Sequence, residues 1–101
     1  MSIEELVKDM QKVSDKPVVY SIKKPLKDKI ELALKALVEG LVKQVVLYYP
    51  REYKVIYIYR DRREGFKLID TSEKKFNPKP VNPSEIDVES LDEPYELLVF
   101  T

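Results

Sequence analysis

The stretch "VVYSIKKPLKDKIELALKALVEGLVKQVVLYY", Val18 to Tyr49, determines the expected fold, because its pattern predicts a strand, a helix and a second strand in direct succession. β-Branched and aromatic residues fill both ends. Pro25 suits the first position of the helix, and Gly40 suits a left-handed cap at its end. The apolar face of this helix consists of Leu26, Ile30, Ala33, Leu34, Leu37, Val38 and Leu41.

Upstream of this stretch, residues 2–13 follow a helical pattern. Ser2 and Glu5 have the spacing of a capping box. The apolar residues then recur at steps of three and four, as one face of a helix requires. They are Ile3, Leu6, Val7, Met10 and Val13. We therefore expect a short helix here, followed by a strand over residues 18–22.

Downstream, the pattern predicts strands over residues 44–49, 53–60 and 66–70. Pro50, Arg51 and Glu52 form the first turn, and the second turn, residues 61–65, has Gly65 available for a positive φ. Along residues 53–60 both faces are substantially apolar, which predicts a central strand. One face carries Tyr53, Val55, Tyr57 and Tyr59, and the other carries Lys54, Ile56, Ile58 and Arg60.

The expected fold class is α+β, with two layers: a mixed sheet of four to five strands and two helices packed on one face. The sheet is expected to be mixed because a strand, helix and strand in succession imply a right-handed parallel crossover. The length predicts a single domain over residues 1–101. Within it we distinguish a basic α/β body (1–70), a proline-rich acidic loop (71–94) and a closing strand (95–101). We expect the closing strand to pair into the sheet, and as an exposed edge it would offer a surface for a protein partner.

The composition argues against most catalytic chemistry. The chain has no Cys, no His and only two Gly, so we expect no enzyme, no cofactor and no metal site of the usual kinds, and neither a P-loop nor a GxGxxG turn can be written. Asp70, Glu73 and Lys75 lie too close together for a metal-dependent nuclease. Neither a signal peptide nor a membrane span is expected, which predicts a cytoplasmic protein, and the abundance of Lys and Glu is typical of hyperthermophiles.

The net charge is zero, but the charges are unevenly distributed. Residues 1–80 carry a net charge of +6, whereas residues 81–101 contain six acids and no base. Basic residues interleaved with tyrosines are typical of surfaces that bind phosphates and stack on bases. The tyrosines concerned are Tyr48, Tyr49, Tyr53, Tyr57 and Tyr59. The candidate nucleic-acid-binding residues are Lys23, Lys24, Arg60, Arg62, Arg63 and Lys67, with Arg51 and Lys54 near them.

Residues 18–47 resemble the opening strand, helix and strand of the Alba family of archaeal nucleic-acid-binding proteins. The shared features are a β-branched run that ends in Lys23-Lys24-Pro25, an Ala/Leu-rich helix that ends on Gly40, and a valine-rich second strand. The resemblance implies that Lys23 and Lys24 contact a nucleic-acid backbone and that a basic hairpin extends toward it. The chain departs from that family after the second strand, where Tyr49-Pro50-Arg51-Glu52 leads into another strand instead of a helix.

Two classes of function therefore remain open. The first is a non-catalytic protein that binds DNA or RNA through the basic hairpin and the lysine pair. The second is a protein-interaction module, for example a homodimer, or a homo-oligomeric subunit of a larger assembly, with no nucleic-acid role. Arg and Tyr are enriched in protein interfaces as well. A charged hairpin is also often only a solvated turn, and alternating tyrosines are often half-buried core residues. Salt dependence separates the two functions, since phosphate contacts weaken steeply with added salt.

Overall fold

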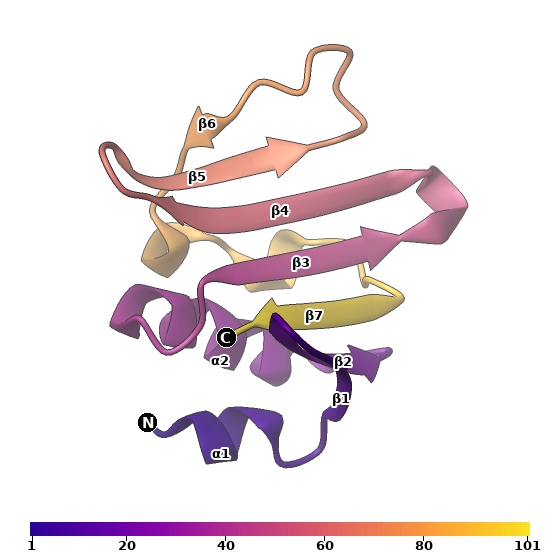
Figure 1. The fold of residues 1–101 in the computed structure, drawn as a ribbon. Coiled ribbons are helices and arrows are strands. Elements are labelled where there is room, and N and C mark those ends of the chain that lie inside the picture. Colours follow the sequence, from indigo (N-terminus) through magenta and orange to yellow (C-terminus); the bar gives the residue numbers. More distant parts are fainter.

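The computed structural model describes residues 1–101 as an α+β fold with one antiparallel sheet of seven strands (Figure 1). The strand order is β1-β2-β7-β3-β4-β5-β6. The two α-helices are α1 (Ile3–Val7) and α2 (Lys27–Glu39). The strands are β1 (Gln11–Asp15), β2 (Val18–Lys23), β3 (Gln44–Tyr49), β4 (Lys54–Asp61), β5 (Gly65–Asp70), β6 (Lys79–Pro80) and β7 (Glu96–Phe100).

The expected mixed sheet is wrong, because β7 lies between β2 and β3. β2 and β3 run in the same direction, as the crossover requires, but each pairs antiparallel with β7. Leu98 faces Ser21 on one side and Val46 on the other. The closing strand is therefore an interior strand and not an exposed edge. The expected number of strands was too low because β1 and β6 were missed.

Helix α2 matches the main sequence signal. Gly40 adopts a left-handed conformation with φ of +81°, and its N–H bonds to the last turn of the helix. Leu34 and Leu37 are buried, as the apolar pattern predicts. The start of the helix differs from the prediction: Leu26 is the N-cap, so that Pro25 precedes the helix instead of opening it. Leu26 points into solvent and contributes nothing to the core.

The core lies between α2 and one face of the sheet (Figure 1). Strand alternation selects which residues enter it, because successive side chains point to opposite faces. The buried face of α2 consists of Ile30, Ala33, Leu34, Ala36 and Leu37. The sheet residues in the same cluster are Val45, Leu47 and Tyr49 of β3, Ile56 and Ile58 of β4, and Leu97 and Val99 of β7.

Helix α1 is much shorter than predicted, because residues 11–15 form β1 instead of continuing it. Gln11 and Lys12 pair with β2, and a helix of five residues has too few hydrogen bonds to compete with that pairing. Leu6 is fully buried against the core. The Lys29 ammonium holds the end of α1 by donating to the Leu6 carbonyl at 2.6 Å and pairing with Asp9 at 2.6 Å.

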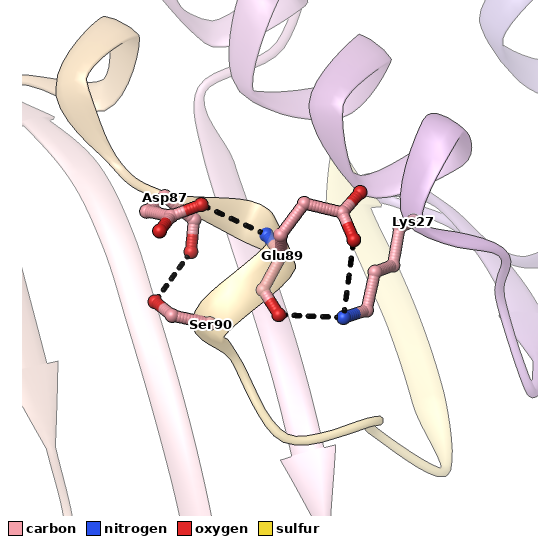
Figure 2. A network of polar contacts seen from close by, with 4 residues as sticks. All are labelled: Lys27, Asp87, Glu89 and Ser90. Atoms are coloured by element: carbon pink, nitrogen blue, oxygen red, sulfur yellow. Dashed lines mark hydrogen bonds and ion pairs between the residues drawn. The ribbon is translucent and has the colours of Figure 1, made fainter.

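The acidic loop is ordered along α2. It contains two 3₁₀ turns, η2 (Pro83–Glu85) and η3 (Val88–Ser90), and both contact that helix. Figure 2 shows how Lys27 attaches η3: its ammonium donates to the Glu89 carbonyl at 2.7 Å and lies 3.6 Å from the Glu89 carboxylate. Asp87 accepts from the Glu89 N–H, and Ser90 donates to the Asp87 carbonyl. Earlier in the same loop, β6 pairs with β5, so the loop starts beside the basic hairpin and then runs to α2 (Figure 1).

Neither α-helix has the length and apolar character that a membrane-spanning helix needs.

Candidate functional site

The six predicted binding residues lie at two opposite ends of the sheet. Lys23 is the last residue of β2 and Lys24 follows it, at the end where Glu96 opens β7 and β3 closes. The hairpin that carries Arg60 to Arg63 lies at the other end, beside Gln44 and the end of β7. Figure 1 shows the β4–β5 hairpin and the end of β2 on opposite sides. The structure therefore does not bring the lysine pair and the arginines into one surface.

Arg60 is occupied within the fold. Its side chain lies on the helix-bearing face, where Nη2 donates to the Val38 carbonyl at 3.1 Å, and the Leu37 carbonyl lies 3.4 Å away. The guanidinium also stacks on the Phe66 ring, 4.6 Å from its centroid. A cation at the last carbonyls of α2 compensates the negative end of the helix dipole. Arg60 therefore caps the C-terminal end of α2.

Lys67 and Lys23 already have acidic partners. Lys67 lies on the face opposite α2 and is only 9% exposed. Its ammonium is 2.5 Å from the Glu64 carboxylate, and this hydrogen bond raises the pKa of Lys67. The Lys23 ammonium lies 3.2 Å from Glu96, which also accepts a hydrogen bond from the Ser21 hydroxyl. Both charges are therefore largely compensated inside the chain.

The other three predicted residues have no acidic partner. Arg62 and Arg63 are exposed in the turn of the hairpin, where the Arg63 N–H donates to the Asp61 carboxylate at 2.9 Å and leaves its guanidinium in solvent. Lys24 is exposed at the other end, with a left-handed backbone at φ of +50°. No carboxylate lies within 4 Å of these three side chains. They are free to bind an anion.

One face of the sheet carries no helix (Figure 1), and we call it the open face. The pairing registers place alternate residues of β7, β3, β4 and β5 on it. All are at least partly exposed except Val46 and Lys67. The open face carries the aromatic residues Tyr48, Tyr57, Tyr59 and Phe100 and the aliphatic residues Val46, Val55, Ile69 and Leu98.

A shallow hollow of about 480 Å³ lies at the hairpin end of the open face. Four of its polar groups are not used by the fold: the Lys43 ammonium, the Gln44 amide and the hydroxyls of Tyr57 and Tyr59 make no hydrogen bond or ion pair within the chain. The hollow is lined by Lys43, Gln44, Tyr57, Tyr59, Arg60 and Ile69. Two aromatic rings thus lie beside an unpaired cation, and the hairpin arginines lie at the same end.

The sequence identified some of these residues and missed others. Strand alternation correctly separated Tyr57 and Tyr59 from Ile58, since the latter is buried. Lys43 and Gln44 were missed because they lie where the connection from α2 enters β3, and no pattern marks them there. Phe100 was missed because the residues beside it, Val19 and Gln44, are known only once β7 is placed between β2 and β3. Tyr49, grouped with the binding tyrosines, instead enters the core and donates to the Asp92 carbonyl at 2.9 Å.

The acidic side chains offer no metal centre. No group of three or more His, Cys, Asp or Glu side chains is placed to hold an ion. Asp70 caps the turn that follows β5, where its carboxylate accepts from the Ser72 N–H at 2.9 Å and from the Ser72 hydroxyl at 2.7 Å.

No family model, no curated protein and no solved structure matches this chain. The similarity of residues 18–47 to the Alba family therefore stays a prediction.

Proposed function

We propose that this chain is a non-catalytic protein that binds single-stranded nucleic acid on its open face. The observation that carries the proposal is the position of Tyr57 and Tyr59, which share an uncovered sheet face with Tyr48 and Phe100 and lie beside the unpaired Lys43. Each base that stacks on an aromatic ring contributes about 1 to 3 kcal/mol. Antiparallel sheets with aromatic residues on an open face are a common platform for unpaired bases.

The geometry favours single strands over duplexes. A flat aromatic surface contacts the π-face of a base only when the base is unstacked, whereas a duplex presents phosphates and groove edges. No helix projects from the open face to enter a major groove. With three free cations at one end, Lys43, Arg62 and Arg63, about three phosphates would be neutralised. The expected slope of log affinity against log salt is then about −2 for single strands.

The first test removes the aromatic platform. A Tyr57→Ser/Tyr59→Ser double variant should bind labelled single-stranded DNA and RNA at least about 30-fold more weakly, because two stacking contacts are lost. Phe76→Ser is the matched control, since Phe76 is an exposed aromatic residue outside the open face. Fluorescence anisotropy at several salt concentrations measures both. Absence of wild-type binding at low salt, where phosphate contacts are strongest, would refute the proposed function.

The second test locates the phosphate contacts. Arg62→Ala with Arg63→Ala should flatten the salt slope by about 1.4, at about 0.7 for each phosphate of a single strand. Lys23→Ala with Lys24→Ala, at the far end of the sheet, is the matched control and should leave the slope unchanged. If the lysine variant changes the slope and the arginine variant does not, the strand binds at the end predicted by the Alba resemblance instead.

A protein partner is the second candidate function, and the ion pairs support it. Lys67 with Glu64 and Lys23 with Glu96 compensate the charges at two corners of the open face, so that its centre is apolar and neutral. Such a centre is typical of protein interfaces. Complex formation that changes little between low and high salt would favour this candidate over nucleic acid.

A further inference from the structure

The end of the sheet away from the basic hairpin contains a cavity of about 720 Å³. The connection from β2 to α2, the 3₁₀ turn η1 (Pro50–Glu52) and the residues before β7 enclose it. Its apolar lining includes Pro25, Leu26, Ile30, Tyr49, Pro50 and Leu91. A cavity of this size has room for a large side chain. No side chain of the core fills it, and it lies apart from the proposed nucleic-acid surface.

An exposed aromatic side chain stands beside this cavity. Tyr53 directly follows η1 and is 92% exposed, so its ring has almost no contact within the chain. Its backbone is left-handed, with φ of +50°, a conformation that is strained for a bulky residue. Leu26, at the cavity itself, is 77% exposed. One end of the molecule thus combines a protruding ring, an exposed aliphatic residue and a hollow.

We propose that a second copy of this chain docks on this end about a two-fold axis, each copy placing its Tyr53 ring in the cavity of the other. A two-fold interface uses the same patch on both subunits, so the patch must carry both a protrusion and a matching hollow. Aromatic residues that fill a partner's pocket are the usual anchors of such interfaces.

The charges at the cavity favour a second copy over other partners. Lys24 and Arg51 line it together with Glu52, Asp92 and Glu93, and none of these five side chains has an ion-pair partner within the chain. A two-fold axis allows the cations of one copy to face the acids of the other, whereas a polyanion or a polycation would meet like charge. A standard interface of about 800 Å² per partner would cover about one-eighth of the 6730 Å² surface.

The test is the mass of the chain in solution as a function of concentration. Sedimentation velocity should show a reversible monomer–dimer equilibrium for the wild type. Tyr53→Gly should raise the dimer dissociation constant at least about tenfold while the monomer stays folded, because glycine adopts positive φ without strain. Phe76→Ser, at the exposed aromatic residue outside this end, should leave the constant unchanged.

Three results would overturn the inference: a wild type that stays monomeric at every concentration, a Tyr53→Gly chain that dimerises as tightly as the wild type, or a dimer that Tyr57→Ser dissociates and Tyr53→Gly does not. The last result would place self-association on the open face. Tyr53 precedes β4 and takes no part in the strand pairing that defines the open face, so Tyr53→Gly should bind single strands as the wild type does per subunit. A chain that binds no nucleic acid can therefore still dimerise through Tyr53. A chain that does not dimerise can still bind nucleic acid on the open face.

Discussion

Arg60 and Arg62 are two residues apart and have different environments, since Arg60 caps α2 and stacks on Phe66 whereas Arg62 lies in solvent. We expect Arg60→Ala to lower the free energy of unfolding by about 1 to 2 kcal/mol, through lost carbonyl hydrogen bonding and ring contact. Arg62→Ala should change it by no more than about 0.5 kcal/mol. Urea denaturation of both variants measures the difference, and equal effects would show that Arg60 is not a cap.

Leu26 occupies the N-cap of α2 with an extended backbone and offers no side-chain acceptor to the free N–H groups of the first turn. Leu26→Ser should therefore stabilise the chain by about 1 kcal/mol, because a serine hydroxyl caps such N–H groups. The measurement is chemical denaturation at low protein concentration, so that self-association does not contribute. Leu26→Ala is the control: if it stabilises as much as serine does, the gain comes from removing an exposed leucine.

Burial raises the pKa of Tyr49 to about 12, from an ordinary value near 10. The folded state disfavours the phenolate, so this contribution to stability is complete below about pH 10 and is lost as the pH rises toward 12. Tyr49→Phe should be about 1 kcal/mol less stable than the wild type at pH 8, where only the hydrogen bond to the Asp92 carbonyl is missing. By about pH 12 Tyr49→Phe should be the more stable of the two proteins, because phenylalanine has no phenolate to bury. Chemical denaturation of both proteins across this pH range measures the change.

At the scale of the element, α2 illustrates what periodicity can predict. Leu34 is nearly fully buried, whereas Val38, one turn later in the same predicted apolar face, lies at the edge of the core. Leu34→Ala should lower the free energy of unfolding by about 2 to 5 kcal/mol. Val38→Ala should lower it by less than about 1 kcal/mol. Thermal and urea denaturation of both variants measure these losses. Equal losses for Leu34→Ala and Val38→Ala would show that α2 packs on the sheet with a different face.

The same periodicity misled the prediction at residues 2–13, and the reason is physical. Met10 and Val13 fit the spacing of a helix face, but the chain leaves α1 after Val7 and pairs Gln11 and Lys12 with β2. A local apolar pattern contains no information about a strand that arrives later in the sequence. The turns, by contrast, were predictable, because Gly40 and Gly65 supply the left-handed residues that a cap and a tight hairpin require.

At the scale of the whole molecule, the sequence specified strands but not their order. Alternation along β4 correctly predicted that Tyr57 and Ile58 lie on different faces and that the strand is interior. The sequence contained no signal that tells which face of the sheet α2 covers, or how far Lys23 lies from the β4–β5 hairpin. The proposed site was therefore predicted in part: the tyrosines and Arg62 and Arg63 follow from pattern and composition, whereas Lys43, Gln44 and Phe100 follow only from the register.

The central position of β7 makes a strong prediction about truncation. A chain that ends at Tyr95 would leave β2 and β3 without their shared neighbour and would remove Leu97 and Val99 from the core. We expect this chain to lack a cooperative unfolding transition, because a sheet split in two cannot enclose the apolar face of α2. Circular dichroism during heating measures it, and a sharp transition near that of the wild type would contradict the arrangement.

The insertion of β7 also has a consequence for synthesis. Tyr49 completes β3 about 50 residues before Phe100 completes β7, which corresponds to roughly 3 to 10 s at about 5 to 20 residues per second. During that interval the facing edges of β2 and β3 have unpaired backbone groups and apolar side chains, and a neighbouring nascent chain on the same messenger would have the same two edges. Spacing between ribosomes should therefore influence how much of the protein reaches its native state.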